Sequence, residues 1–279
     1  MSESVIKNTK NIREGLSKKE TYLLSKLSAK GRSVITIKDI LGSFPISYAN
    51  ATKTANRLVK KKWLVQLVRG QYLIVPLSAG TEGTHTDYDF VLGSRLAEPY
   101  YIGYWSMLNS YGFTEQVPFT TFIATTKRVK NRKIMAGRFK FITISKKKFF
   151  GTREKNFGDT KVIVSDKEKT IIDCLDHPEY CGGIEEVLKA FKGKIDFSAE
   201  KVLEYGKKLG NVSALKRFGF LLELVGNPFS EKVLRSIRNK GKGYSKLDPI
   251  LGPKGKYSYK WKLLINVDEK TLKGDVRAY

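Results

Sequence analysis

Cysteine, histidine and long apolar runs are scarce in this sequence, and each scarcity excludes a class of protein. The 279 residues include two cysteines and two histidines. A zinc site needs four ligands, which Cys174, His177 and Cys181 do not supply, so we interpret the cysteines as small packed thiols and expect no metal or cofactor. No stretch approaches the roughly 18 apolar residues of a membrane-spanning helix. The polar N-terminal segment also lacks the apolar core of a signal peptide, so we expect a cytoplasmic protein without membrane contact.

Acidic residues are outnumbered as well. Asp and Glu total 27 against 52 Lys and Arg, which gives a net charge of +25. Such an excess repels itself unless a polyanion is a normal partner, and nucleic acid is the first candidate. The hydrophobic fraction of 41% supports folded cores, and the length suggests two domains.

Residues 17–76 follow the element order of a winged helix-turn-helix domain. Ser17 begins the first helix with capping-box spacing to Glu20, and Thr36 and Ser47 precede two further helical segments as N-caps. Two strand-like runs, WLVQLV and QYLIV, are joined by Arg69-Gly70, which is typical of a β-hairpin. Three helices and a hairpin wing therefore predict a DNA-binding domain.

The third helical segment, residues 47–62, has two chemically different faces. Small alanines recur at helical spacing on the inner face, whereas the outer face carries amides, hydroxyls and cations that match base edges and phosphates. The alternative is a solvated face of a protein-binding module. The residues that we expect to contact DNA are Ser47, Tyr48, Asn50, Lys53, Thr54, Arg57, Lys60, Lys61 and Arg69.

Residues 84–279 predict a larger mixed α/β domain, so the expected fold class is α+β. Helical patterns cover 84–96 and 103–110, strand-like runs cover 119–126, 138–145 and 160–165, and the remainder is helical to about residue 239. A basic stretch at 127–133 contains Lys127, Arg128, Lys130, Arg132 and Lys133. It is either a solvated loop or a set of phosphate contacts.

The segment VSDKEKTIIDCLDHPEYCGGIEEV predicts a helix whose first residues, Ser165 to Glu168, have capping-box spacing. Acidic residues in a basic protein also suggest a nuclease. That alternative needs carboxylates on adjacent strands, whereas these lie at a helix start, and no phosphate-binding loop or Ser-His-Asp set is present. We therefore expect no enzymatic activity and no catalytic residues.

Several longer segments resemble one family. They are RGQYLIVP, GYWSMLNSYGFTEQVP, FIATTKR, the segment VSDKEKTIIDCLDHPEYCGGIEEV, ALKRFGFLLE and KWKLLINV, and together they resemble the AbiEi family of abortive-infection antitoxins. The resemblance implies a repressor that binds inverted repeats in its own promoter. It also implies a C-terminal domain that counters a nucleotidyltransferase-like toxin of a type IV toxin–antitoxin operon without a stable complex. Within the matching segment, Lys169, Asp173 and Asp176 are the candidates for an antitoxin surface.

Two other functions remain open: a stand-alone winged-helix regulator and a general nucleic-acid-binding protein without a toxin partner. An RNA-binding protein would be expected to show stacking aromatics in a recognisable strand pattern. The sequence has no coiled-coil heptads, so we expect a monomer in solution that binds its operator as two copies.

Overall fold

The computed structural model describes residues 13–77, 86–134, 137–157, 160–192, 195–238, 241 and 243–274. Its elements form two compact units. The first unit comprises described residues within 1–98, 130–139 and 154–162, and the second those within 99–129, 140–153 and 163–279. Helices and strands are mixed in both, which confirms the expected α+β class at this level.

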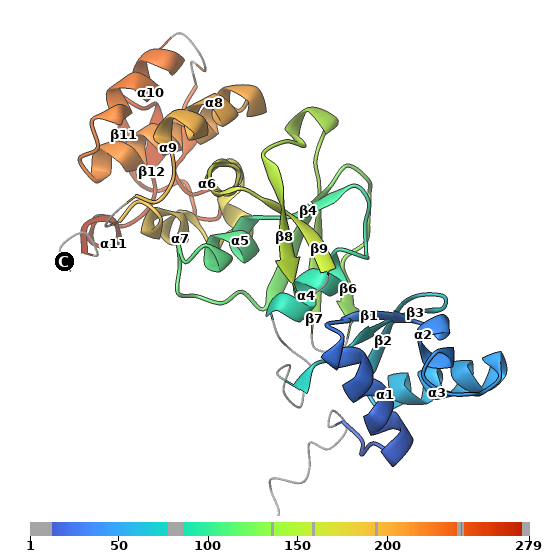
Figure 1. Ribbon diagram of the computed structural model, residues 1–279. Helices are drawn as coiled ribbons and strands as arrows, with labels where there is room; N and C mark the ends of the chain where they lie inside the picture. The colour runs from blue at the N-terminus through green and yellow to red at the C-terminus, as the bar shows by residue number, and fades with distance from the viewer. Residues whose placement is uncertain are drawn as a thin grey trace, which may run out of the picture. The chain divides into compact units, whose positions relative to one another are not determined.

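The N-terminal part of the first unit alternates short helices and strands (Figure 1). Its elements are α1 (Lys18–Ala29), β1 (Val34–Thr36), α2 (Ile37–Leu41), α3 (Tyr48–Lys60), β2 (Leu64–Val68) and β3 (Gln71–Ile74), followed by α4 (Thr86–Gly93). The strands form an antiparallel sheet in the order β1-β3-β2. The predicted helix start at Thr84 lies outside the described residues.

The local signals explain where these helices begin. The Ser17 Oγ accepts from the Glu20 backbone N–H while the Glu20 carboxylate accepts from the Ser17 N–H, so the predicted capping box is confirmed. At α2 the Asp39 carboxylate accepts from both the N–H and the hydroxyl of Thr36. Fully buried aliphatic side chains such as Leu23, Ile35 and Leu58 then join the helices to the sheet in one core.

A six-stranded sheet occupies the middle of the chain, in the order β6-β7-β5-β4-β9-β8. The strands are β4 (Tyr100–Ile102), β5 (Thr120–Thr125), β6 (Arg132–Ile134), β7 (Gly137–Thr143), β8 (Thr152–Phe157) and β9 (Thr160–Ser165). β4 pairs antiparallel with β5 and parallel with β9. The predicted strands correspond to β5, β7 and β9, whereas the short β4 and the polar β6 and β8 lack a clear alternating pattern and were not predicted.

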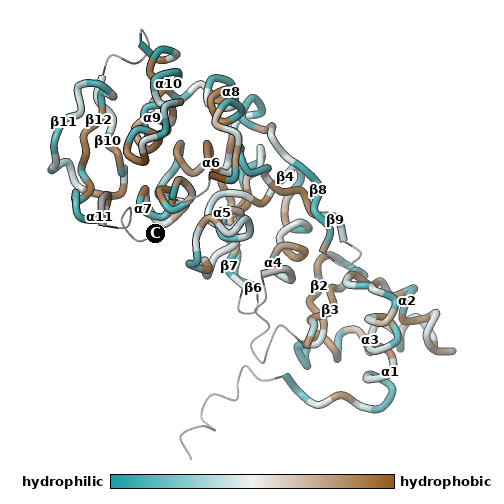
Figure 2. The backbone as a smooth tube through the Cα atoms, turned by 60° about the vertical axis from the view of Figure 1, so that its left-hand side comes forward, coloured by the Kyte–Doolittle hydropathy of each residue, from teal (hydrophilic) through white to brown (hydrophobic). Residues whose placement is uncertain are grey.

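The second unit is largely helical after this sheet. Its remaining elements are α5 (Tyr104–Ser110), η3 (Lys146–Lys148), α6 (Lys167–Asp176), η4 (Pro178–Tyr180), α7 (Ile184–Lys189), α8 (Ala199–Leu209), α9 (Val212–Leu224), α10 (Phe229–Ile237), β10 (Ser245–Lys246), β11 (Lys256–Ser258), β12 (Leu263–Ile265) and α11 (Glu269–Gly274). The last three strands form a small sheet in the order β10-β12-β11. Figure 2 shows hydrophobic stretches along α6 and α9, which supply much of the core.

Helix α6 is in contact with α5, α7, α8 and α9. Ile171, Ile172 and Leu175 are fully buried, as predicted. The predicted cap at Ser165 is wrong by one residue: Asp166 is the N-cap, and its carboxylate accepts from the Lys169 N–H at 2.7 Å. Ser165 instead shares a hydrogen bond with Thr170.

Cys174 and Cys181 are buried free thiols within the second unit's core, which confirms their interpretation as packed side chains. Among the residues that the structure describes, no helix has the length and apolar character needed to cross a bilayer.

Candidate nucleic-acid interface

Helix α3 is held against the core of the first unit by small residues. Its N-cap Ser47 accepts from the Asn50 N–H at 3.3 Å. Ala51, Ala55 and Leu58 are fully buried on its inner face. Alanine at two of these three positions lets the helix pack close to its neighbours, and the opposite face is left to solvent.

The centre of the exposed face of α3 is a strip of four residues. Ala49, Lys53, Asn56 and Lys60 follow one another at spacings of three or four residues, and all four are exposed. The helix contains no acidic residue. An exposed helix face with cations, an amide and a methyl group carries the group types that recognise phosphates and base edges in a major groove.

Arg57 and Lys61 flank this strip, and both are tied to Glu20 of α1. The Arg57 Nε donates to Glu20 Oε1 at 2.6 Å, and the Lys61 Nζ donates to Oε2 at 2.8 Å. Burial alone would raise the pKa of Glu20, but hydrogen bonds from Lys61, Ser17 and Arg57 outweigh it and lower the pKa to about 2. One buried carboxylate therefore positions two cations beside the exposed strip.

The hairpin between β2 and β3 carries the remaining predicted contact. Arg69 is exposed at the turn. Gly70 follows with φ of 79°, a left-handed conformation that glycine adopts without strain. The turn therefore presents one cation to solvent at the tip of a two-stranded ribbon.

The structure separates the predicted DNA contacts into two groups. Those whose side chains are exposed are Ser47, Tyr48, Asn50, Lys53, Arg57, Lys60 and Arg69. Thr54 is a half-buried residue, and its hydroxyl donates back to the Asn50 carbonyl at 2.9 Å. The Lys61 side chain is only 18% exposed and also donates to the Gly15 carbonyl, so it belongs to the interior contacts of α1.

Two strip residues were missed by sequence reasoning. Ala49 and Asn56 lie four residues before and three residues after Lys53, so helical spacing alone would have placed them beside it. Neither residue carries a charge, and neither stands at a capping position, so only the helical spacing marks them. Asn56 adds an amide that can donate to and accept from one base edge.

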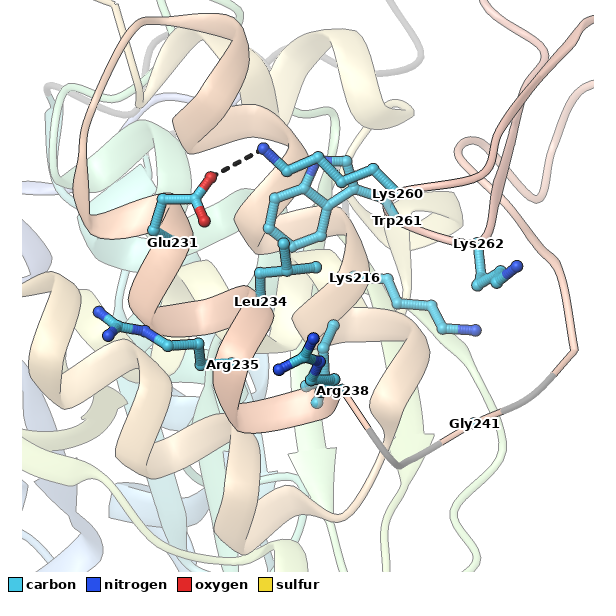
Figure 3. A pocket seen from close by; sticks show the side chains of 10 residues that line it. Lys216, Glu231, Leu234, Arg235, Arg238, Gly241, Lys260, Trp261 and Lys262 are labelled. Atoms are coloured by element: carbon cyan, nitrogen blue, oxygen red, sulfur yellow. Dashed lines mark hydrogen bonds and ion pairs between the residues drawn. The ribbon is translucent and has the colours of Figure 1, made fainter.

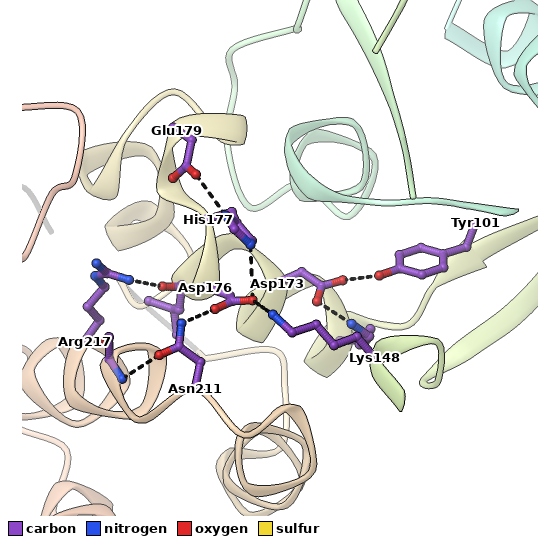
Figure 4. Close-up of polar contacts among 11 residues, drawn as sticks. Tyr101, Lys148, Asp173, Asp176, His177, Glu179, Asn211 and Arg217 are labelled. Atoms are coloured by element: carbon purple, nitrogen blue, oxygen red, sulfur yellow. Dashed lines mark hydrogen bonds and ion pairs between the residues drawn. The ribbon is translucent and has the colours of Figure 1, made fainter. Parts of the chain in front are cut away.

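The predicted antitoxin surface is not a surface, and that prediction is wrong. Lys169, Asp173 and Asp176 are 0%, 2% and 7% exposed. The Lys169 Nζ donates to Asp173 Oδ1, and the Tyr101 hydroxyl donates to Oδ2 of the same carboxylate at 2.7 Å (Figure 4). The residues are buried because neighbouring helices pack around α6 and leave these three positions without a solvent-facing side.

Asp176 belongs to an adjoining network at the end of α6. It accepts from the Lys148 Nζ at 2.7 Å and from the amide of Asn211, the N-cap residue of α9 (Figure 4). Arg217 of α9 donates to the Leu175 carbonyl at 2.7 Å. These bonds join the C-terminal end of α6 to η3 and α9, so Asp176 and its partners hold these helices together.

The acidic residues at the start of α6 are also engaged. Asp166 accepts from Lys201 and from the Tyr205 hydroxyl, both at 3.0 Å. Glu168 accepts from Lys201 and from the Ser198 N–H, again at 3.0 Å. These contacts lower the pKa of Glu168 against the opposing effect of its partial burial. The α6 N-terminus therefore works as a junction with α8.

The basic stretch at 127–133 leads into β6. Its cations Lys127, Arg128, Lys130, Arg132 and Lys133 are all exposed. This exposure fits both a solvated segment and a set of phosphate contacts.

Comparison with known proteins gives a fold relationship. No family model and no curated protein sequence matches the chain. Among solved structures, the chain is similar to the crystal structure of the RV2827C protein from Mycobacterium tuberculosis, with a TM-score of 0.64 and 16% identity. The match covers 96% of this chain and 98% of that chain. At this identity the likeness shows that the two chains share a fold over nearly their whole lengths.

Proposed function

We propose that the chain is a DNA-binding repressor whose residues 17–76 form a winged helix-turn-helix domain. The observation that carries this proposal is the exposed strip of α3, where Lys53, Asn56 and Lys60 lie on a helix without carboxylates. Support also comes from the order of three helices followed by the β2–β3 hairpin. In this arrangement α3 is the recognition helix and Arg69 lies at the tip of the wing.

We further propose that the repressor serves as the antitoxin of a type IV toxin–antitoxin operon. This part rests on the resemblance to the AbiEi family. The burial of Lys169, Asp173 and Asp176 moves the proposed antitoxin surface to exposed residues of the second unit. Toxin neutralisation would then depend on the buried network only through the fold that it maintains.

The DNA-binding proposal is tested by selecting bound fragments from a random duplex pool with the full chain. The expected result is enrichment of an inverted repeat occupied by two copies of a protein that is monomeric in solution. Replacing Lys53 and Lys60 with alanine should abolish the enrichment. Lys19→Ala is a matched control, because Lys19 is an exposed lysine on α1. Binding without enrichment would instead indicate a general nucleic-acid-binding protein.

The antitoxin proposal needs a separate experiment. The adjacent reading frame should encode a nucleotidyltransferase, and its expression should be toxic to cells that lack this chain. The Lys53→Ala/Lys60→Ala variant should lose repression and still rescue those cells. If rescue disappears together with operator binding, the antitoxin effect is transcriptional control alone.

A further inference from the structure

We propose that the second unit carries a binding surface for single-stranded nucleic acid, formed by Tyr244, Tyr257 and Tyr259 beside a cationic pocket. This inference goes beyond the duplex contact of α3. It concerns different residues, in the other compact unit, and a different form of nucleic acid.

The three tyrosines form an exposed aromatic cluster. Tyr244, Tyr257 and Tyr259 are 41%, 56% and 76% exposed. The Tyr244 ring centroid lies 4.9 Å from that of Tyr257 and 6.3 Å from that of Tyr259, both in edge-to-face orientation. Unstacked bases bind such rings by stacking, and every base offers a face for this contact.

A pocket of about 790 Å³ adjoins the cluster, and cations dominate its rim (Figure 3). Arg235 and Arg238 are exposed at the end of α10, and Lys262 lies across the pocket from them. Among the described residues, no ion-pair partner accompanies these three side chains. The one acidic lining residue, Glu231, accepts from Lys260, which also pairs with Glu223, and Glu231 is outnumbered by five cations among the lining residues.

Lys262 connects the two features. Its Nζ lies 5.4 Å from the ring centroid of Tyr244 and 5.9 Å from that of Tyr259, and the same residue lines the pocket. An ammonium that lies over these rings is close to where the phosphate of a nucleotide stacked on the cluster would lie. Bases on the tyrosines and phosphates over the pocket therefore fit one continuous strand.

The turn that carries Tyr259 and Lys262 is held in place by the buried side chain of Trp261. Trp261 is 2% exposed, and its Nε1 donates to Glu223 at 2.7 Å. Its ring fills the space over Gly219, where a Cβ would lie 2.1 Å from the indole. Lys262 follows in a left-handed conformation with φ of 50°, which a lysine adopts only when its surroundings impose it. The surface is therefore preorganised.

The chemistry of the surface favours a single strand over other polyanions. In a duplex the base faces are stacked inside the helix, so rings can reach them only on single-stranded segments or ends. An anionic membrane would call for an amphipathic helix with a continuous apolar face of Leu, Phe or Trp beside the cations. Here the side chains next to the cations are the tyrosines and Leu234, and Leu234 is half-buried in the pocket wall.

The test measures the fluorescence anisotropy of labelled oligouridylate and oligothymidylate as the full chain is added. Each oligonucleotide has about 12 nucleotides, a length within the range of known single-strand sites. A random duplex serves as the third probe. Tyr257→Ala/Tyr259→Ala should weaken binding of single strands about fivefold or more, the effect of losing a stacked base. Binding of duplex should not change. Tyr257→Phe/Tyr259→Phe should bind like the wild type, because the rings are kept.

The cations give an independent measurement. Arg235→Ala/Arg238→Ala should lower the slope of log K against log salt for single strands by about 1.4, since each phosphate contact contributes about 0.7. Lys207→Ala, an exposed lysine of α8, and Tyr22→Ala, an exposed tyrosine of α1, are matched controls that should leave binding unchanged.

The outcomes separate this proposal from the proposed function. Lys53→Ala/Lys60→Ala should weaken duplex binding alone, so each surface can fail independently. Tighter binding of oligouridylate than of oligothymidylate would identify RNA as the ligand. Equal binding would show that the surface accepts single strands of RNA and of DNA. The proposal is overturned if the tyrosine-to-alanine variant, folded and melting like the wild type, binds single strands unchanged. It is also overturned if phosphatidylserine vesicles bind and neither oligonucleotide does.

Discussion

The Nε of Arg57 lies 2.6 Å from Oε1 of Glu20 and joins a half-exposed guanidinium on α3 to a carboxylate with no exposed side-chain surface on α1. Lys61 binds the other oxygen of the same carboxylate. The pair links the stability of the first unit to the orientation of the helix that we propose enters the groove. Arg57 is therefore both a candidate DNA contact and a structural residue.

Glu20→Gln should destabilise the protein by about 2–3 kcal/mol, because two cations lose a buried carboxylate. The pKa of Glu20 is lowered from 4.5 to about 2 in the folded chain. A lowered carboxyl pKa stabilises the fold above about pH 4.5, and that contribution is lost as the pH falls towards 2. Urea unfolding at pH 7 and pH 3 checks this: the difference between the wild type and Glu20→Gln should shrink at pH 3.

Lys53→Ala and Lys60→Ala should each weaken duplex binding, and the double variant should lower the salt slope by about 2 if both lysines contact phosphates. A direct base contact by Lys53 would instead show as about 1–3 kcal/mol of lost discrimination at one base pair. Gel shifts over a salt series distinguish the two. Unchanged affinity and unchanged sequence preference in the double variant would show that α3 does not bind in the major groove.

Arg69→Ala should lower affinity for operator and random duplex by the same factor and reduce the salt slope by about 1. The reason is its position at the exposed tip of a hairpin, which in the proposed arrangement lies over phosphates. Competition titrations with both duplexes provide the measurement. A loss restricted to one operator base pair would show that the wing reads sequence.

Asp173→Asn should destabilise the protein by about 3–5 kcal/mol, because it leaves the fully buried Lys169 ammonium without its charge partner. Burial raises the pKa of Asp173 although Lys169 opposes that effect. Asp196→Asn is the control, because the Asp196 side chain is 69% exposed in its pair with Lys167 and such pairs contribute about 1 kcal/mol or less. Equal urea midpoints for the two variants would show that the buried pair contributes no more stability than the exposed pair.

Joint replacement of the pair extends this test. Lys169→Met with Asp173→Leu removes both charges and should be more stable than Asp173→Asn alone, because an isolated buried charge costs more than none. If that stable double variant also rescues cells from the toxin, the pair has no direct antitoxin role. Loss of rescue in a variant that melts like the wild type would assign it one.

The sequence by itself determined the local elements of the first unit. The capping residues Ser17, Thr36 and Ser47 and the turn at Arg69-Gly70 act through hydrogen bonds and dihedral preferences within a few residues, so their positions can be derived from the chain. The buried and exposed faces of α3 also follow from periodicity, since only one side of that helix meets the core.

Tertiary structure alone decided which polar and aromatic residues are buried and which lie together on the surface. The resemblance to the AbiEi family suggested an antitoxin surface with Lys169, Asp173 and Asp176, but neighbouring helices contact α6 and bury those side chains. The tyrosines at 244, 257 and 259 are brought together because β10 and β11 both pair with β12 and because the turn is anchored at Trp261. Periodicity reports one face of one element, whereas burial and clustering depend on what packs around it, and those partners are distant in sequence.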